Sequence, residues 1–381
     1  MRLLAPIVAG LLAAVTTACS GDTASSGALG PTTSEGDGGW PFAVEEVDRF
    51  DEPWAMAFVP GSGDLLVTER SGVLHLRDAA SGEVAEVSGA PEVVDAGQGG
   101  LGDVAVSPTY DEDGLVYLSW VEEGDGGTGA VVGRARLDED AAALDDLEVL
   151  WRQTPKVGGD GHFSHRLAFD PDGEHLFVSS GDRQQGSPAQ DTSNTLGSIV
   201  RLTRDGEAAP GNPLADEGGA TAEIWSWGHR NPLGLEFAPD GTLWSTEMGP
   251  EGGDELNVVE AGENYGWPEV SDGSEYGGGE IPDHADGDGY AAPEVSWNPS
   301  ISPGSLLVYS GDLFPDWQGD ALVGALSGEA LVHVDLDGTT AGDVEVFDTG
   351  ERIRAVEEGP DGAIWLLEDE GAGRLLRLTP A

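Results

Sequence analysis

Residues 235–246 read LEFAPDGTLWST: an apolar run, a proline, an Asp-Gly turn and a second apolar run. Asp-Gly favours the tight turn of a β-hairpin. The proline before it cannot donate to a strand ladder, so it ends the first strand. The flanking residues are rich in types that favour strands. The stretch therefore predicts two antiparallel strands joined by a short loop.

The same pattern recurs along the chain. Its turn prolines stand at positions 60, 108, 171, 239 and 360, with steps of 48, 63, 68 and 121 residues. The last step is about twice the others, and residues 321–334 (ALVGALSGEALVHV) fill that gap as a degenerate unit. Six units of this length, each with several strands, predict an all-β fold, namely a six-bladed β-propeller.

Three further expectations follow from this architecture. The ring of a propeller closes when strands from both ends of the chain pair, so residues 43–47 should lie near residues 375–378. Helical periodicity is nearly absent, and only residues 141–150 are compatible with a turn or so of helix. Functional residues should be scattered along the chain and meet at one mouth of the central channel, because the loops there come from different blades.

The chain is strongly acidic, with 71 Asp and Glu against 17 Lys and Arg and a net charge of −54. Such a surface repels nucleic-acid phosphates, so we expect no nucleic-acid partner. Lys156 is the only lysine. Against this background the closely spaced Arg352 and Arg354 stand out; they alternate along a predicted strand and should share one face.

The N-terminus has the layout of an export signal. Residues 1–18 begin with Arg2 and continue as an apolar run that is short for a membrane span. Cys19 follows small residues as in a bacterial lipoprotein cleavage site, although Thr16 stands where leucine is usual. We expect lipidation of Cys19 and an anchor on the outer face of the cytoplasmic membrane. The alternative is a plain signal peptide and a secreted or periplasmic protein.

The remaining domain boundaries follow from composition. Cys19 is the only cysteine, which excludes a disulfide framework. Residues 19–39 are rich in Ser, Gly and Thr and predict a flexible tether. Residues 40–381 then form the propeller domain.

Residues 224–268 concentrate polar side chains on turns rich in Gly and Pro. This is typical of a binding surface at strand ends, although tight turns capped by Asx side chains explain the same residues. The stretch contains GHRNP (228–232), EMGP (247–250), GDELN (253–257) and NYGWP (264–268). Four motifs in this order and spacing resemble the signature of the glucose/sorbosone dehydrogenase family. The resemblance covers roughly residues 50–379.

The resemblance implies a six-bladed propeller that uses pyrroloquinoline quinone (PQQ) and Ca²⁺ to oxidise aldoses. It implies catalytic roles for His162, in GDGHFSHRLAF (159–169), and for Arg230. The implied PQQ contacts are Gln98, Arg230, Asn231, Trp297, Ser300, Arg352 and Arg354. The implied calcium ligands are the carbonyls of Gly249 and Pro250 beside the quinone, and Glu255 and Tyr265 at a further site.

Each of these roles has a simpler alternative. His162 could be a histidine of a surface loop, although histidine suits a base near neutral pH. Arg352 and Arg354 could form surface ion pairs, although arginine binds carboxylates such as those of PQQ bidentately. Asp182 is expected to serve a turn, and His165 is expected to have no functional role.

Two positions depart from the pattern of the family. Ser327 stands where many relatives have a lysine that pairs with a carboxylate of the cofactor. Losing one charge-assisted contact costs about 1.5–3 kcal/mol, or one to two decades of affinity. Ser164 and His165 stand where small residues are usual, and their bulk could alter access of the sugar.

The implied reaction is oxidation of an aldose at its anomeric carbon to the lactone, with hydride transfer to the quinone. The resemblance implies that an external acceptor then takes the electrons; the sequence has no haem attachment motif, which needs two cysteines. Two other classes stay open. One is a calcium-dependent lactonase-like hydrolase, and the other is a non-enzymatic, lipid-tethered binding module.

Overall fold

A computed structural model describes residues 32–34, 40–369 and 371–381. The predicted signal peptide, Cys19 and most of the tether lie outside the described residues. Three residues of the expected tether, Thr32–Ser34, form strand β1, which pairs in parallel with β24. Among the described residues, none of the helices has the length and apolar composition needed to span a membrane.

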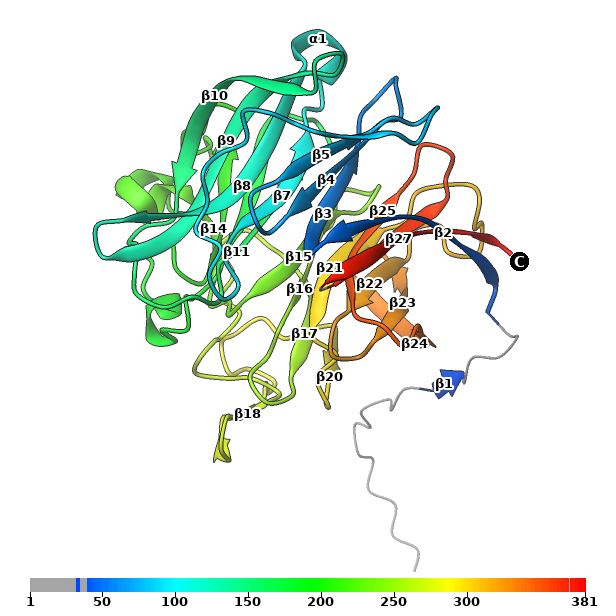
Figure 1. Cartoon of the computed structure of the whole chain (residues 1–381). Coiled ribbons are helices and arrows are strands. Elements are labelled where there is room, and N and C mark those ends of the chain that lie inside the picture. Colours follow the sequence, from blue (N-terminus) through cyan, green and yellow to red (C-terminus); the bar gives the residue numbers. More distant parts are fainter. Residues whose placement is uncertain (1–31, 35–39, 370) are drawn as a thin grey trace, which may run out of the picture. The chain divides into compact units, whose positions relative to one another are not determined.

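Six four-stranded sheets are arranged in a ring, and β1 adds a fifth strand to one of them (Figure 1). The innermost strand of each sheet is the one next to the central channel. These six strands are β3 (Pro53–Phe58), β7 (Leu101–Val106), β11 (Ser164–Phe169), β15 (Pro232–Phe237), β21 (Pro303–Val308) and β25 (Ile353–Glu358). Each contacts the next around the ring, and β25 contacts β3. The predicted all-β, six-bladed propeller is confirmed.

The other strands of each blade follow outward from the channel. They are β4 (Leu65–Glu69), β5 (Leu74–Arg77) and β6 (Val84–Glu86); β8 (Leu115–Gly124), β9 (Gly127–Asp138) and β10 (Ala143–Arg152); β12 (His175–Ser180), β13 (Ser198–Thr203) and β14 (Ile224–Trp227); β16 (Leu243–Glu247), β17 (Asp254–Val258) and β20 (Val295–Trp297); β22 (Ala321–Ala325), β23 (Ala330–Asp337) and β24 (Thr340–Asp348); and β26 (Ile364–Glu368), β27 (Ala372–Pro380) and β2 (Phe42–Asp51). A small hairpin, β18 (Ser274–Glu275) and β19 (Gly279–Glu280), lies apart from the blades.

The ring closes as predicted. Strand β2, from the start of the domain, pairs antiparallel with β27 at its end, with Ala43 opposite Thr379 and Val44 opposite Leu378. The last blade therefore combines both ends of the chain. Residues 321–334, predicted as a degenerate unit, supply β22 and part of β23 and complete the sixth blade.

The Asp-Gly turn of residues 235–246 joins β15 to β16. Ala238 N–H donates to Thr242 O at 2.8 Å, and Asp240 Oδ1 accepts from Thr242 N–H at 2.9 Å. Gly241 has φ of +92°, a value that favours glycine. The same turn chemistry fixes the register of β15 and β16, with Phe237 opposite Leu243.

The expectation of helix within residues 141–150 is wrong. The segment forms a turn and then β10, whose Leu144 pairs with Leu137 of β9. Leu144 is buried in the core between blades, so packing overrides the helical propensity of the alanines. The helical turns are instead α1 (Tyr110–Asp113), η1 (Ser187–Gln190), η2 (Ala215–Glu217) and η3 (Gly219–Glu223).

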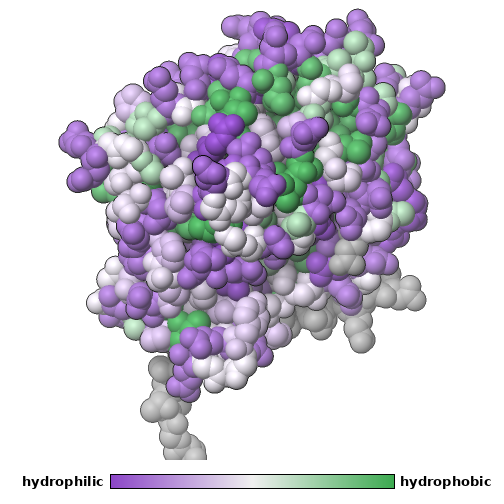
Figure 2. All heavy atoms as spheres, turned by 60° about the vertical axis from the view of Figure 1, so that its left-hand side comes forward, coloured by the Kyte–Doolittle hydropathy of each residue, from purple (hydrophilic) through white to green (hydrophobic). Residues whose placement is uncertain are grey.

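Apolar side chains pack between adjacent blades, and the acidic residues lie mostly outside. One core cluster joins Trp54 of β3 to Leu101 of β7 and Trp120 of β8. Another joins Leu307 of β21 to Val356 of β25. Figure 2 shows one face that is mostly hydrophilic, with hydrophobic residues in small groups. The core thus holds the innermost strands in fixed positions, and the loops at their ends can carry a site.

Candidate active site

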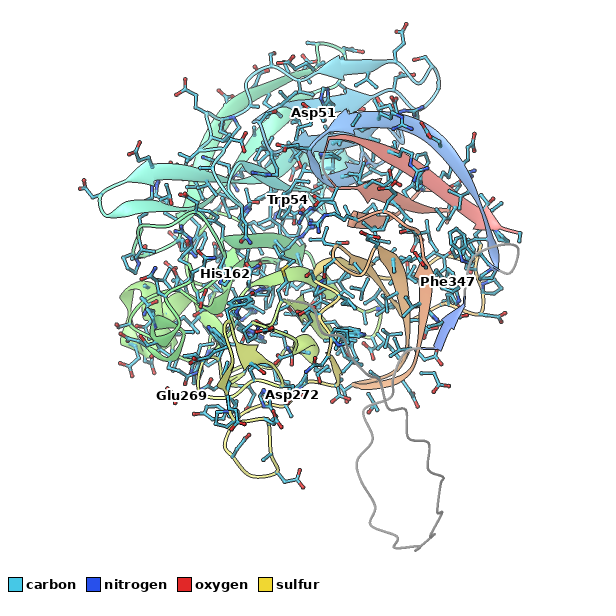
Figure 3. All side chains as sticks on the ribbon, turned by 60° about the horizontal axis from the view of Figure 1, so that its bottom comes forward. Asp51, Trp54, His162, Glu269, Asp272 and Phe347 are labelled. Atoms are coloured by element: carbon cyan, nitrogen blue, oxygen red, sulfur yellow. The ribbon has the colours of Figure 1, made fainter. Side chains whose placement is uncertain are left out.

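A cavity of about 300 Å³ opens where the innermost strands begin. Its lining comes from several blades and includes Trp54, Ser164, Leu233, Ser302 and Arg354. Figure 3 shows Trp54 close to the centre of the ring. Residues scattered along the sequence therefore meet at one mouth of the channel, as predicted.

The lining of this cavity carries net positive charge in a chain of net charge −54. The lining includes three arginines, Arg70, Arg352 and Arg354, and only two carboxylates, those of Glu52 and Asp369. Both Arg352 and Arg354 pair with Asp369 at 2.8 Å, so they share one face as the sequence predicted. Such a cavity attracts an anion.

The opposite mouth of the channel has the opposite character. A second cavity there is lined by Asp103, Glu236, Glu357 and Glu358, with Arg166 as its arginine. Burial, together with the charges of Asp103 and Glu358, raises the pKa of Glu236 to about 8. The two ends of the channel thus differ in charge, and the arginine-lined end is the one suited to an anionic cofactor.

Arg166 links the innermost strands between the two mouths. Its guanidinium lies 4.0 Å from the centroid of the Trp54 ring and donates to Asp103 Oδ1 at 3.1 Å. It also donates to Leu233 O and to Gly304 O, both at 2.7 Å. This buried network ties five innermost strands together beneath the site: β3, β7, β11, β15 and β21.

His162 is held by two contacts next to the cavity. Its Nδ1–H donates to Asp182 Oδ1 at 2.6 Å, and its backbone N–H donates to Gln98 Oε1 at 2.7 Å. Gln98 lines the cavity. Because Nδ1 is occupied, Nε2 is the ring nitrogen left to accept a proton. The arrangement places an oriented base beside the arginine-lined cavity, whose lining includes the neighbouring Phe163 but not His162 itself, and Figure 3 shows His162 to one side of Trp54.

Asp182 has a larger role than the expected turn. Besides His162, it accepts hydrogen bonds from Trp267 Nε1 at 2.7 Å and from the backbone N–H of Gln184 at 2.7 Å. Burial alone would raise its pKa, but the hydrogen bond and charge of His162, with Trp267 and Gln184, hold the pKa of Asp182 below its usual value. Asp182 is therefore an ionised carboxylate, buried and directed at the base.

The backbone around His162 is strained. His162, Ser164 and His165 have φ of +51°, +59° and +55°, and Arg183 in the facing loop has φ of +56°. Non-glycine residues rarely adopt this region, and such strain is concentrated at functional sites. The strain is compatible with a loop built to present His162 rather than with an ordinary surface loop.

The two residues that depart from the family pattern have defined contacts. Ser164 Oγ donates to Asn231 Oδ1 at 3.0 Å, and the NH₂ group of Asn231 donates to Met248 Sδ at 3.9 Å. His165 is buried, stacks on Trp54 with ring centroids 5.1 Å apart and shares a 2.7 Å hydrogen bond between Nδ1 and Ser119 Oγ. Burial, with the charges of Arg166 and Arg183, lowers the pKa of His165 to about 3. His165 is therefore neutral and part of the core, a position that the sequence did not predict.

Arg230 and Asn231 lie at the start of β15, beside Met248. Arg230 Nη1 donates to Met248 O at 2.9 Å, and its guanidinium lies 5.2 Å from the Trp267 ring. Arg230 Nε is buried and has no hydrogen-bond partner among the described residues. A buried donor without a partner is costly, so this atom requires a ligand or water.

Three of the four predicted calcium ligands line a pocket next to Arg230, and Pro250 is not among its lining residues. Gly249, Glu255 and Tyr265 line it, together with Glu247. Burial and the charges of Glu247, Asp272 and Asp254 raise the pKa of Glu255 well above its usual value. Glu247 accepts from His229 Nδ1 at 3.0 Å and from Arg230 N–H at 2.7 Å. The Tyr265 hydroxyl donates to Val258 O at 2.6 Å and accepts from Glu260 N–H at 2.9 Å, so the backbone carbonyl is the Tyr265 oxygen left for a cation.

Three of the other predicted residues lie at the rim or below it. Ser300 Oγ donates to Asp254 Oδ1 and accepts from Gly252 N–H, both at 3.2 Å. Trp297 is 7% exposed and packs in the core with Leu256 and Leu306, a position that does not favour the predicted stacking on the quinone. Ser327 shares a 2.7 Å hydrogen bond with Ser302 Oγ at the wall of the cavity.

Sequence reasoning missed the roles of Asp182, Arg70 and Trp267. Arg70 donates to Gly97 O at 2.7 Å and to Gly99 O at 3.3 Å, so it holds the loop that carries Gln98. The signal for Asp182 was the Gly-Asp-Arg run after a strand, which reads equally well as a turn. Only the distance to His162 distinguishes the two roles.

A sequence model of the glucose/sorbosone dehydrogenase family matches residues 50–377. The chain is 40% identical to the aldose sugar dehydrogenase YliI of Escherichia coli K12 over 341 residues, 87% of this chain and 91% of that protein.

Two solved structures are also similar. The apo form of the soluble aldose sugar dehydrogenase from E. coli has a TM-score of 0.85 and 38% identity, covering 89% of this chain and all of that chain. The PQQ-bound aldose sugar dehydrogenase from Streptomyces coelicolor has a TM-score of 0.72 and 29% identity, covering 89% of this chain and 98% of that chain. The chain belongs to the glucose/sorbosone dehydrogenase family.

Proposed function

We propose that this protein oxidises an aldose at its anomeric carbon to the lactone, with PQQ and Ca²⁺ as cofactors. The observation that carries the proposal is the His162–Asp182 pair, 2.6 Å apart, at the edge of a cavity lined by three arginines. A base directed by a buried carboxylate suits proton abstraction from a hydroxyl. The arginines suit a small, highly anionic cofactor rather than a neutral ligand.

The side chains present fit PQQ. Its three carboxylates match the guanidinium groups of Arg70, Arg352 and Arg354, which bind carboxylates bidentately. Asn231 and Gln98 add amide groups to the same wall. Arg230 lines the adjacent pocket rather than this cavity, and its buried Nε, which has no hydrogen-bond partner within the described part of the chain, is a donor open to an anionic ligand there. When bound, PQQ supplies the hydride acceptor.

The loop of residues 249–253 would hold the calcium ion. Its N–H groups are directed away from a cation: Gly249 to Asp254 Oδ1 at 2.9 Å, Glu251 to Ser274 O at 2.9 Å and Gly253 to Trp297 O at 3.0 Å. The shape of the loop is therefore fixed by the protein. Its carbonyls at Gly249 and Pro250 are hard oxygen donors of the kind calcium prefers.

Four residues of the chain would have separate roles in the reaction. His162 Nε2 takes the proton of the anomeric hydroxyl, and Asp182 stabilises the imidazolium that forms. Arg230, which lines the adjacent pocket, would supply a positive charge to the bound cofactor. Gln98 accepts from the backbone of His162 and so fixes the base relative to the cavity.

The proposal extends to the cellular setting. The electrons would leave to an external acceptor, and the sequence has no cysteine pair for covalent attachment of a haem. Lipidation of Cys19 would anchor the protein on the outer face of the cytoplasmic membrane, where sugars are accessible. Metabolic labelling with a radioactive fatty acid tests this, and loss of label in Cys19→Ser is the expected result.

Replacement of the base tests the proposed reaction. We expect His162→Ala to abolish reduction of bound PQQ by aldoses while its affinity for PQQ changes less than threefold. His175→Ala is the matched control, because it removes a 2.7 Å His–Asp hydrogen bond, to Asp170, that lies outside the cavity. Full activity in His162→Ala would overturn the assignment.

A further inference from the structure

His284 is a buried imidazole whose environment in the protein is incomplete. Its side chain is only 5% exposed, and both ring nitrogens lack a hydrogen-bond partner among the described residues. A neutral imidazole always has one donor and one acceptor, and buried polar atoms are nearly always satisfied. An unsatisfied pair of this kind points to an ion or a water that belongs at the site.

The imidazole faces a buried carboxylate. His284 Nε2 lies 3.8 Å from Glu255 Oε1, which is too long for a hydrogen bond. Glu255 Oε2 accepts from Asn257 Nδ2 at 3.0 Å, and Asn257 Oδ1 is itself buried and without a partner in the described chain. Several polar atoms around one carboxylate are thus unsatisfied together.

Negative charge accumulates at the same place. Glu247, Asp254 and Asp272 all act electrostatically on Glu255. The loop of His284 is tied to one of them, because His284 N–H donates to Asp272 Oδ1 at 3.2 Å. Figure 3 shows Asp272 well away from Trp54 at the centre of the ring, so this cluster lies outside the cavity. A cation between Glu255 and His284 would balance the charge and satisfy the imidazole.

We infer that Glu255 and His284 together bind a divalent transition-metal ion, of which zinc is the test case. An imidazole nitrogen beside a carboxylate suits zinc and similar borderline ions, whereas calcium prefers oxygen ligands alone. Two ligand atoms at about 2.1 Å from a tetrahedral zinc lie about 3.4 Å apart. The observed 3.8 Å is a few tenths of an ångström wider, within reach of a side-chain adjustment.

The inference changes the identity of one ion only. The resemblance to the family implies a further calcium at Glu255 and Tyr265, and the nitrogen ligand replaces that expectation with a transition metal. The carbonyls of Gly249 and Pro250 offer only oxygen donors, so an ion held there would be calcium. The inference does not rest on the proposed sugar oxidation, because it concerns metal binding by the protein without quinone.

A second cluster must be separated from this one. Asp320, His333 and Asp335 also offer ligand atoms within 4.8 Å of one another. The starting protein for the test is therefore His333→Gln, which removes the imidazole of that cluster. In this background, His284→Gln and Glu255→Gln remove the two proposed ligands one at a time.

The test is titration calorimetry of chelator-treated protein with ZnCl₂, without PQQ. We expect one tight zinc site in His333→Gln, which tenfold excess CaCl₂ does not displace. Adding His284→Gln should weaken that site at least tenfold and leave calcium binding unchanged. Equal zinc affinity with and without His284 would overturn the inference, as would displacement of zinc by calcium.

X-ray absorption at the zinc edge keeps the inference testable if His284→Gln fails to fold. Zinc-loaded His333→Gln should show nitrogen in its first coordination shell, with the multiple scattering of imidazole. Oxygen ligands alone would contradict the inference and return the site to calcium or to water.

Discussion

Asp182→Asn is the sharpest perturbation of the proposed site, because it changes one charge and almost no volume. Asp182 is 1% exposed, and its 2.6 Å hydrogen bond to His162 Nδ1 is charge-assisted. Such bonds contribute about 1.5–3 kcal/mol. The imidazolium that His162 forms during proton abstraction would lose this stabilisation, so kcat should fall about 10- to 150-fold.

The structure adds a second reason for a loss of this size. Asp182 Oδ1 accepts from both His162 Nδ1 and Gln184 N–H, and Oδ2 accepts from Trp267 Nε1 and Gly186 N–H. The asparagine NH₂ must therefore face two donors whichever way it turns. If it faces His162, it favours the tautomer with the proton on Nε2, which cannot act as a base.

Stopped-flow reduction of protein-bound PQQ by an aldose measures the effect directly. The account predicts lower kcat with PQQ affinity and the KM for sugar changed less than threefold. Asp170→Asn is the matched control, since it alters the similar pair with His175 outside the cavity. Unchanged kcat in a folded Asp182→Asn protein would refute the reasoning, and so would a loss explained entirely by weaker PQQ binding.

The remaining predictions concern affinity, stability and pH. Ser327→Lys introduces the cation that many relatives have at this position and should tighten PQQ binding about 10- to 100-fold in a fluorescence titration. Unchanged affinity would show that an arginine already pairs with that carboxylate of the cofactor. Gly102→Ala places a Cβ 1.9 Å from His165 Cε1, a ring held between Trp54 and Ser119, so the free energy of unfolding in urea should fall by about 1–3 kcal/mol. The pKa of Glu236 is about 8 in the folded protein, above its value in the unfolded chain, so the folded protein binds this proton more tightly. The stability of the fold therefore decreases as the pH rises from about 4.5 to 8. One pKa unit corresponds to about 1.4 kcal/mol. Glu236→Gln should therefore raise the free energy of unfolding by about 1–3 kcal/mol at pH 9 and leave it unchanged at pH 4. Equal effects at both pH values would contradict this prediction.

The fold was predictable because its signal is repeated. Each blade repeats an apolar run, a proline and a Gly-containing turn, so single errors are outweighed by the other units. The error at residues 141–150 arose where alanine and leucine favour a helix locally and Leu144 is needed in the core between blades. That burial depends on a neighbouring blade, which no local pattern reveals.

The candidate site was predictable only where a residue is recognised by its own motif. His162, Arg230 and the pair Arg352 and Arg354 fall in such motifs. The roles of Asp182 and His284 depend on residues that other segments bring next to them. Asp182 lies 2.6 Å from His162, and His284 lies 3.8 Å from Glu255. His284 in particular lies in an acidic stretch that reads as a solvated loop, and its burial comes from tertiary packing.

The most direct test of the account is titration of the purified, calcium-loaded protein with PQQ, followed by anaerobic addition of aldoses while the quinone absorbance is recorded. The account predicts saturable binding of one PQQ and its reduction on addition of a suitable sugar, with the lactone as product. Absence of PQQ binding by the wild-type protein would contradict the assignment of the arginine-lined cavity as its site.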